Sequence, residues 1–371
     1  MALLTTHTTH TTHTTHTTHT THTTHPGPGG GGGSASPLVA DALLSSQVGL
    51  GHWTLDGQRR PVTVTHAGLQ SRLNAGPGGA VNSLPMARFR GMDALPRAYV
   101  CFSELMDRVS FDGSTAAAAC LSLRGANPAP IVTLRRPSHA LFVAQLAQVH
   151  ALSAERTERA TEILAQLAPP AAWWTSVVNL RPQRHAKTLE FIDAVLNFTV
   201  TVIFRFKQLA GCPRPVEYSA QIQPLVATPG HDSWPSGHST ESFAVARVLA
   251  TLRPDAGPQL RAHAARIAQN REVAGVHFPT DSAAGAVLGD TLARFVIAVG
   301  QGGQAPEEVR SAIFDSEQVY AGDARRTLAL DTWIEGEECR GPLVWNGTLA
   351  ASAAEADYIA ELWRQAQAEW A

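Results

Sequence analysis

The stretch WPSGHST, residues Trp234–Thr240, stands directly before an apolar segment with helical periodicity. Ser236 is a residue type that caps helix N-termini, and Gly237 allows a ligand to approach the backbone closely. The first N–H groups of a helix lack intrahelical partners and lie at the positive end of its dipole, so this start predicts an anion-binding cradle. His238 would lie at the edge of a bound oxyanion, placed to donate or accept a proton. Taken alone, the motif also fits a structural histidine in a capped loop.

A lysine and an arginine lie upstream, in KQLAGCPRP, residues Lys207–Pro215. Only two of the 29 basic residues are lysines, so a lysine here indicates that a compact ammonium group is needed. Lys207 ends an apolar segment, which predicts a buried stem with its head facing a cavity. Arg214 follows seven residues later, and Pro215 gives it an extended exit. A solvated helix C-terminus with a cationic cap is the alternative interpretation.

A third cluster follows downstream, in NREVAGVHFPTD, residues Asn270–Asp281. Arg271 lies on one helical stripe with three apolar residues, Leu260, Ala264 and Ile267. Burying a guanidinium without a partner is costly, so either a carboxylate or an anionic ligand should meet it. Asp281 stands four residues after His277, so its carboxylate can hold one imidazole nitrogen and leave the other directed at a reacting atom. A purely structural His–Asp pair is the alternative.

The composition is that of a globular protein. The 371 residues are 44% hydrophobic and 16% charged, with a formal net charge of -2. There is no basic excess to mark a nucleic-acid surface and no acidic run to mark a solvating tail. The four cysteines are scattered without a Cys-x-x-Cys pair, which favours reduced thiols over a disulfide framework.

The first 36 residues differ from the rest. Thr5–His25 repeats Thr-Thr-His, and a Pro/Gly/Ser stretch follows. This composition predicts a disordered repeat with a flexible linker, residues 1–36, and the remaining residues, 37–371, are assigned to a single domain. The repeat is interpreted as a solvated appendage, with chelation of Zn, Ni or Cu by its imidazoles as the alternative. It lacks the features of a signal peptide, so a cytoplasmic location is expected.

Beyond His139 the periodicity is helical. Three segments carry apolar stripes at i, i+3, i+4 and i+7, formed by Val245, Val248, Leu249 and Leu252, by Leu288, Leu292, Phe295, Val296 and Val299, and by Ile359, Leu362, Trp363, Ala366 and Trp370. With strand-like alternation scarce, we predict a mainly α fold, a bundle of about eight to ten helices.

Two local features refine this prediction. Ser153 is a candidate N-cap for a helix in which Glu155 and Arg159 pair at i, i+4. The most apolar helical window, Ala194–Phe204, is shorter than the ~20 residues that a bilayer requires, so no membrane span is expected. Few elements can be assigned in residues 37–130.

Taken together, the three clusters are far more specific than each is alone. Lys-(six residues)-Arg-Pro, then Pro-Ser-Gly-His, then Arg-(five residues)-His-(three residues)-Asp resembles the signature of one superfamily. That superfamily joins type 2 phosphatidic acid phosphatases, bacterial acid phosphatases and vanadium-dependent haloperoxidases. The match spans Lys207–Asp281, and the helical segment from about Pro130 is similar to the soluble members. The third motif usually begins with serine, where this sequence has Asn270, a change expected to alter only the surroundings of the site.

The resemblance implies a helical bundle of this type and a role for each motif residue. The equatorial oxygens of a tetrahedral or trigonal-bipyramidal oxyanion would be bound by Lys207, Arg214, Ser236, the Gly237 amide and Arg271. His277 would attack phosphorus or coordinate vanadium, with Asp281 orienting it. His238 would be the acid or base on the opposite side.

Haloperoxidase chemistry is the first choice. His231 lies seven residues before His238, which resembles the bromoperoxidase pattern, and Phe204 lies three before Lys207. With Trp234, these residues form the candidate halide or substrate pocket. Vanadate is the expected cofactor, with halide and peroxide as substrates. No nucleic-acid partner is expected, and homo-oligomerisation is left open.

Two alternatives remain at this point. The short gap from His238 to Arg271 resembles the compact acid phosphatases, which would hydrolyse a phosphomonoester through a phosphohistidine without a cofactor. A non-catalytic oxyanion-binding protein is the second alternative. It would need the cations but not two positioned histidines.

Overall fold

The computed structural model describes residues 84–115, 118–125, 129–167, 171–302, 309–318, 343–349 and 358–371. The chain divides into two compact units at Ala98. The described part of the smaller unit holds helix α4 (Leu84–Gly91) and the start of α5 (Ala94–Asp107), where Arg97 donates a hydrogen bond to the carbonyl of Arg90. The predictions for the Thr-Thr-His repeat and its linker lie outside the described residues.

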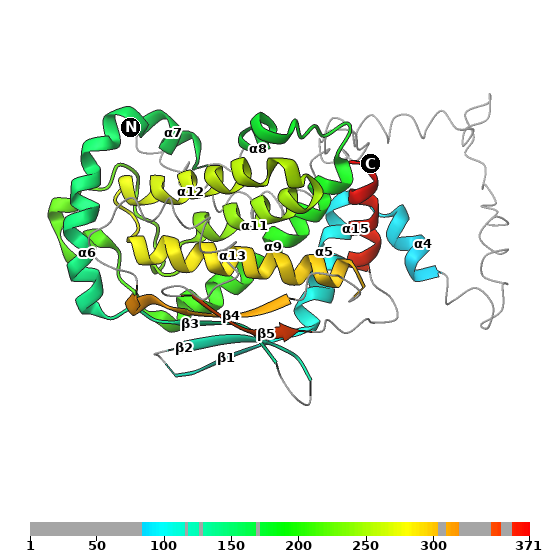
Figure 1. Ribbon diagram of the computed structural model, residues 1–371, viewed down its shortest axis with the longest axis horizontal. Coiled ribbons are helices and arrows are strands. Elements are labelled where there is room, and N and C mark those ends of the chain that lie inside the picture. The colour runs from blue at the N-terminus through cyan, green and yellow to red at the C-terminus, as the bar shows by residue number, and fades with distance from the viewer. Residues whose placement is uncertain are drawn as a thin grey trace, which may run out of the picture. The chain divides into compact units, whose positions relative to one another are not determined.

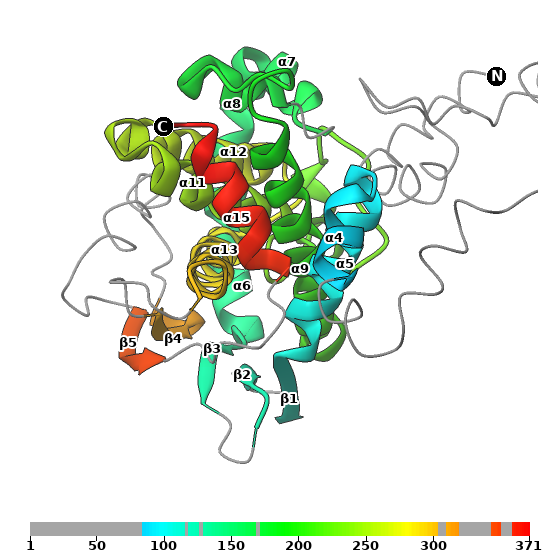
Figure 2. The ribbon, with the colours of Figure 1, turned by 90° about the vertical axis from the view of Figure 1, so that its right-hand side faces the viewer.

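The larger unit is a helical core, which confirms the mainly α fold (Figure 1). Its centre is formed by α9 (Ala186–Ala210), α11 (Gly237–Leu252), α12 (Gly257–Val273) and α13 (Pro279–Gly300). Helix α11 packs against the other three, and Figure 2 shows α13 end-on between these helices and the sheet. The surrounding helices are α6 (His139–Leu152), α7 (Arg156–Ala165), α8 (Ala171–Val178), α10 (Pro215–Tyr218) and α15 (Tyr358–Ala368).

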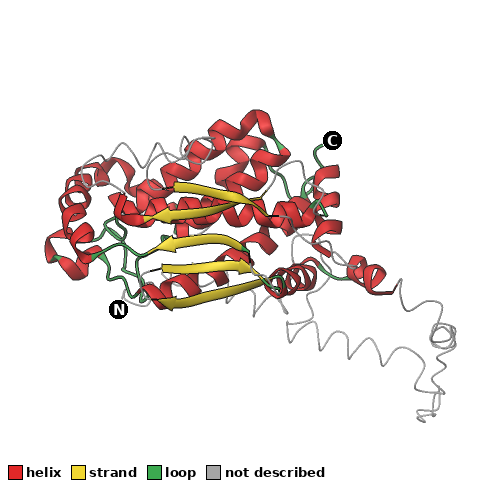
Figure 3. Cartoon of the chain, turned by 60° about the horizontal axis from the view of Figure 1, so that its bottom comes forward, coloured by secondary structure: helices red, strands yellow, loops and turns green. Residues whose placement is uncertain are grey.

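A five-stranded sheet lies beside α13, and the sequence pattern did not predict it (Figure 3). Its strands, in spatial order, are β1 (Val109–Thr115), β2 (Ala118–Leu123), β3 (Pro130–Arg135), β4 (Val309–Asp315) and β5 (Leu343–Leu349). All pairs are antiparallel except β3 and β4, whose parallel register sets Val132 opposite Ala312. These strands are only six or seven residues long, and the whole helical core separates β3 from β4 in sequence. The pairing is therefore long-range and leaves little trace in local periodicity.

The predicted apolar stripes are confirmed. Their residues are buried, except Leu252 and Trp370 at helix ends, which are half-buried. The predicted pair of Glu155 and Arg159 forms at 2.6 Å. The predicted N-cap at Ser153 is wrong: Ser153 is the C-cap of α6 and begins a 3-10 turn, and α7 starts only at Arg156.

Among the described residues, one helix is long and apolar enough to span a membrane by composition. This helix is α13, with a mean hydropathy of 1.5, and 94% of the window is buried inside the protein. It is longer than the window Ala194–Phe204, which the sequence analysis singled out. Burial on all sides explains this composition, because α13 lies between other helices and the sheet.

Two glycines allow α11 and α13 to approach closely. Gly285 and Gly289 are four residues apart and therefore lie on one face of α13. A Cβ atom at Gly285 would lie 2.6 Å from the carbonyl oxygen of Ser236, and one at Gly289 would overlap the carbonyl of Thr240. The amide of Ser236 also donates to the carbonyl of Asp281 at 3.0 Å. The starts of the two helices are thereby held together.

This contact yields a prediction about stability. Gly289→Ala should lower the free energy of unfolding by about 1–3 kcal/mol, because the added methyl group overlaps backbone of α11 and cannot rotate away. Urea denaturation of the full chain measures the change. Gly230→Ala is the matched control, since no atom lies within 4 Å of a Cβ there, and it should stay within about 0.5 kcal/mol of wild type. Equal effects of the two substitutions would contradict the close-packing explanation.

Candidate oxyanion site

Lys207 reaches the site from the last turn of α9. The helix ends at Gly211, which adopts a left-handed conformation (φ 56°) that favours glycine. The Lys207 side chain is buried, and its Nζ donates to the main-chain carbonyls of Asp232 at 2.6 Å and Ser233 at 2.9 Å. The predicted buried stem is confirmed, and the ammonium group is held by the loop that precedes α11.

Arg214 connects that loop with the third cluster. Its backbone is extended (φ -79°, ψ 158°), as expected before a proline. One guanidinium nitrogen, Nη1, donates to the carbonyl of Val276 at 2.7 Å and lies 3.0 Å from Nε2 of His277. The Nε atom donates to the carbonyl of His231 at 3.0 Å, and Nη2 lies 3.1 Å from Nδ1 of the same residue.

Arg271 comes from the last turn of α12 and is 1% exposed. Its Nη2 donates to the carbonyl of Ile163 at 3.0 Å and to Oε1 of Gln166 at 3.3 Å. Its Nε is buried and has no hydrogen-bond partner within the described residues. The sequence predicted that a carboxylate or an anionic ligand would meet this guanidinium, and no carboxylate is in contact with it in the described chain.

The three cations share one property. In the part of the chain that the structure describes, none of them forms an ion pair, because their acceptors are carbonyl, amide and imidazole atoms. Burial lowers the pKa of Arg214 and of Arg271 to about 10, so both stay charged at neutral pH. Burial, followed by the nearby Arg214, lowers the pKa of Lys207 well below its usual value. Buried cations without carboxylate partners are stabilised by an anionic ligand.

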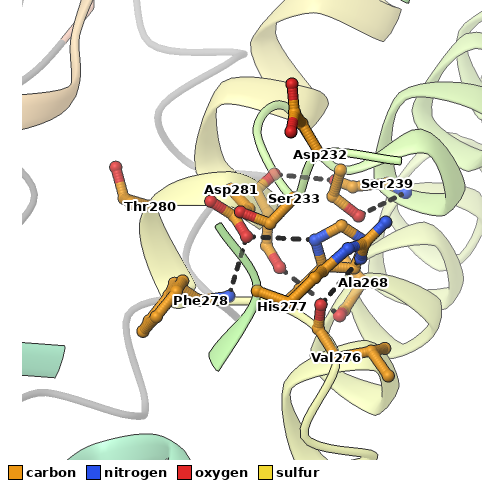
Figure 4. A network of polar contacts seen from close by, with 12 residues as sticks. Asp232, Ser233, Ser239, Ala268, Val276, His277, Phe278, Thr280 and Asp281 are labelled. Atoms are coloured by element: carbon orange, nitrogen blue, oxygen red, sulfur yellow. Dashed lines mark hydrogen bonds and ion pairs between the residues drawn. The ribbon is translucent and has the colours of Figure 1, made fainter. Parts of the chain in front are cut away.

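His277 and Asp281 form the predicted pair (Figure 4). Asp281 is the third residue of α13, and its Oδ2 lies 3.0 Å from Nδ1 of His277 and 2.9 Å from the amide nitrogen of Phe278. Burial raises the pKa of Asp281 to about 6, while the Phe278 amide and Lys207 act in the opposite direction. Burial, then Arg214 and Lys207, lowers the pKa of His277 well below its usual value. A neutral His277 with Nδ1–H held by Asp281 leaves its Nε2 lone pair beside Arg214.

Helix α11 begins as predicted. Ser236 is its N-cap, with Oγ accepting from the amide of Ser239 at 3.5 Å, and Gly237 is its first residue. The Nε2 atom of His238 lies 3.2 Å from the main-chain carbonyl of Gln166. Burial, followed by Arg271, lowers the pKa of His238 to about 3, so this imidazole is neutral at pH 7 without a ligand.

The three residues expected in the halide or substrate pocket do not all come together. Phe204 and His231 are exposed and lie edge to face with ring centroids 5.3 Å apart, next to Arg214. Trp234 is buried and lines a small cavity against the sheet with Phe206 and Leu134. The structure therefore groups Phe204 with His231 and places Trp234 on the sheet side.

Two residues near the site were missed by the sequence reasoning. Gln166, at the C-terminus of α7, contacts both Arg271 and His238. Glu241, Gly237 and His238 are half-buried, whereas the other residues of 236–250 are fully buried. Burial raises the pKa of Glu241 to about 7, and Lys207 opposes this shift. Glu241 could have been found from the sequence, because it lies four residues after Gly237 and therefore on the same helix face. Gln166 could not, because it is far in sequence from the three motifs.

A family comparison covers the segment that holds this site. Residues 190–303 match the model of the PAP2 superfamily, a range that includes Lys207–Asp281. No curated protein matches the chain. One similar solved structure is described as "Crystal structure of the first bacterial vanadium dependant iodoperoxidase", with 18% sequence identity and a TM-score of 0.35. That match covers 42% of this chain and 48% of the other, so the chain spans about half of that structure's length.

Glu241 yields a prediction about pH. Its carboxyl group is neutral below about pH 7 and ionised above it, and the ionised form beside Lys207 opposes an incoming anion. The affinity for sulfate, which stays dianionic in this range, should therefore fall several-fold between pH 6 and pH 8.5. Isothermal titration calorimetry measures this change. In Glu241→Gln the decrease above pH 7 should be largely absent.

The matched control is Glu158→Gln, an exposed glutamate on α7. It makes the same charge change away from α11 and should keep the wild-type pH dependence. An unaltered decrease in Glu241→Gln would contradict the role given to this carboxyl group.

Proposed function

We propose that the chain, whose residues 190–303 match the model of the PAP2 superfamily, is an oxyanion-site enzyme that uses vanadate to oxidise halide with peroxide. The observation that carries this proposal is a set of three buried cations, Lys207, Arg214 and Arg271, that have no carboxylate partner among the described residues. A preorganised cluster of this kind stabilises an anion in a site that excludes water. Neutral acceptors hold each cation in place without neutralising its charge.

The residues present fit vanadate by the chemistry of their donors. The Nε atom of Arg271 has no hydrogen-bond partner in the described part of the chain. The hydroxyl of Ser236 and the amide of Gly237 lie at the start of a sixteen-residue helix. These groups, with Lys207 and Arg214, would hold the oxygens of vanadate. His277 would bind the group through Nε2, since Asp281 occupies Nδ1. When bound, vanadate would supply the Lewis acidity that activates peroxide toward halide.

Overall, halide, hydrogen peroxide and one proton give hypohalous acid and water. His238 would hold or release the proton, since it lies at the same helix start as Gly237. An anion beside His238 favours the protonated imidazole, so ligand binding would raise the low pKa of this residue.

The grouping of His231 and Phe204 favours a halide as the substrate. The two rings are exposed and His231 contacts Arg214, so a halide arriving from solvent would meet an imidazole and an aromatic edge next to the site. A positive aromatic edge and an N–H donor are both suited to a soft anion.

Hydrolysis of a phosphomonoester is the second candidate. Only the short turn η4 (Pro254–Ala256) joins α11 to α12, which keeps the segment between His238 and Arg271 as compact as the sequence resemblance to acid phosphatases implies. In this reaction Nε2 of His277 would attack phosphorus while the ester P–O bond breaks and His238 protonates the leaving alkoxide. Water would then cleave the phosphohistidine N–P bond, with His238 accepting its proton.

One experiment separates these chemistries. The full chain is incubated with increasing orthovanadate, and bromide-dependent bromination of a phenol indicator by peroxide is assayed in parallel with hydrolysis of an aryl phosphate. We expect bromination that saturates with vanadate and falls by about 100-fold or more in His277→Ala. In His231→Ala, vanadate binding should persist while kcat/KM for bromide falls several-fold.

His150→Ala provides the control, because His150 is an exposed histidine on α6 and should leave bromination unchanged. Phosphate release that vanadate inhibits, without bromination, would favour the second candidate over the first. Retained vanadate binding without either reaction would leave a non-catalytic oxyanion-binding protein and overturn both.

A further inference from the structure

Gln166 lies at the point where α7 ends against the start of α11 and the last turn of α12. Its side chain is buried, and it is the C-cap of α7. Its Oε1 accepts from Nδ2 of Asn270 at 3.0 Å and from Nη2 of Arg271 at 3.3 Å, and its Nε2 donates to Oε1 of Glu162 at 3.1 Å. The amide oxygen of Gln166 therefore faces Arg271, and its amide nitrogen faces Glu162.

This arrangement requires an amide at position 166. Asn270, in the position where the sequence motif departs from serine, donates to the same oxygen that Arg271 uses, and its own Oδ1 accepts from Arg159 at 3.2 Å. A carboxylate at position 166 would place an acceptor against Glu162 and repel it. The neighbours therefore select a neutral group that orients the Arg271 guanidinium and leaves its charge uncompensated.

The main chain of Gln166 holds the second group. Its carbonyl lies 3.2 Å from Nε2 of His238. A main-chain carbonyl only accepts hydrogen bonds, so Nε2 carries a hydrogen and Nδ1 is the nitrogen left to exchange a proton with a ligand. The same residue thus sets the orientation of the imidazole on one side and of the guanidinium on the other.

We propose that Gln166 is a positioning residue of the oxyanion site, which orients Arg271 through its side-chain amide and His238 through its carbonyl while adding no negative charge. This inference rests on the proposed function only to the extent that the site binds an oxyanion. It makes the affinity for an anion depend on the neutrality of position 166. It also makes the proton-exchange behaviour of His238 depend on the same residue.

The test compares Gln166→Glu with Gln269→Glu in the full chain. Gln269 is also a buried amide, one residue from Asn270, but its Oε1 accepts from Arg159 at 2.8 Å and not from Arg271. The binding of orthovanadate and of sulfate is measured by calorimetry, and the pH profile of whichever turnover the wild type has is recorded. The melting temperature of each variant reports whether it is folded.

Gln166→Glu should weaken the binding of both anions by about tenfold or more, since the new carboxylate pairs with Arg271. A carboxylate near His238 also favours the imidazolium, so the limb of the pH profile that belongs to His238 should move upward by about one unit. Gln269→Glu should bind both anions as wild type does and keep the wild-type profile. If Gln166 has only a structural role, Gln166→Glu should lower the melting temperature and leave the His238 limb of the pH profile unchanged.

Wild-type affinity in Gln166→Glu, or equal weakening in Gln269→Glu, would overturn the inference and leave the proposed function intact. Absence of vanadate and sulfate binding in the wild type would instead overturn both. If Gln166→Glu does not fold, Gln166→Met carries the test without added charge. This variant lacks the acceptor for Arg271, so it should bind both anions several-fold more weakly. Unchanged affinity would overturn the inference.

Discussion

The close approach of α11 and α13 at Gly285 and Gly289 is the constraint on which the candidate site depends. Each helix begins with a part of the candidate site. Ser236–His238 lie at the start of α11, and Asp281, four residues after His277, lies in the first turn of α13. Because the glycines let the backbones touch, the amide of Ser236 reaches the carbonyl of Asp281. The separation of the two histidines is thus set by close packing of two helix backbones, which compresses little.

Packing of this kind also makes three buried cations tolerable. A guanidinium or ammonium group inside a protein must recover its lost hydration through hydrogen bonds. Here main-chain carbonyls supply most of them, from Asp232 and Ser233 for Lys207, from Val276 and His231 for Arg214, and from Ile163 for Arg271. These dipoles belong to loops and helix ends that the core holds in place. They stabilise the charges without neutralising them, and the site keeps a positive potential for an anion.

The pKa values of the titratable groups around the site are also shifted by burial and by this positive potential. Burial and the nearby cations keep His238 and His277 neutral in the ligand-free chain, by lowering the pKa of each. A bound anion would favour the protonated imidazole at His238, so we expect proton uptake to be coupled to binding. Burial shifts the pKa of Glu241 in the opposite direction and raises it to about 7, so this carboxyl group is neutral below about pH 7.

The sequence by itself determined the chemistry-bearing residues and the helices that carry them. Residue type and spacing alone gave the N-cap at Ser236, the extended backbone at Arg214, the buried stripe with Arg271, and the His277–Asp281 pair, because these depend on neighbours within one or a few turns. Tertiary structure alone decided the rest. The parallel pairing of β3 with β4, the cavity that Trp234 shares with Leu134, the contact of Phe204 with His231, and the contacts of Gln166 with Arg271 and His238 join segments far apart in the chain. Such contacts are selected by how the whole core packs, and local periodicity carries no record of them.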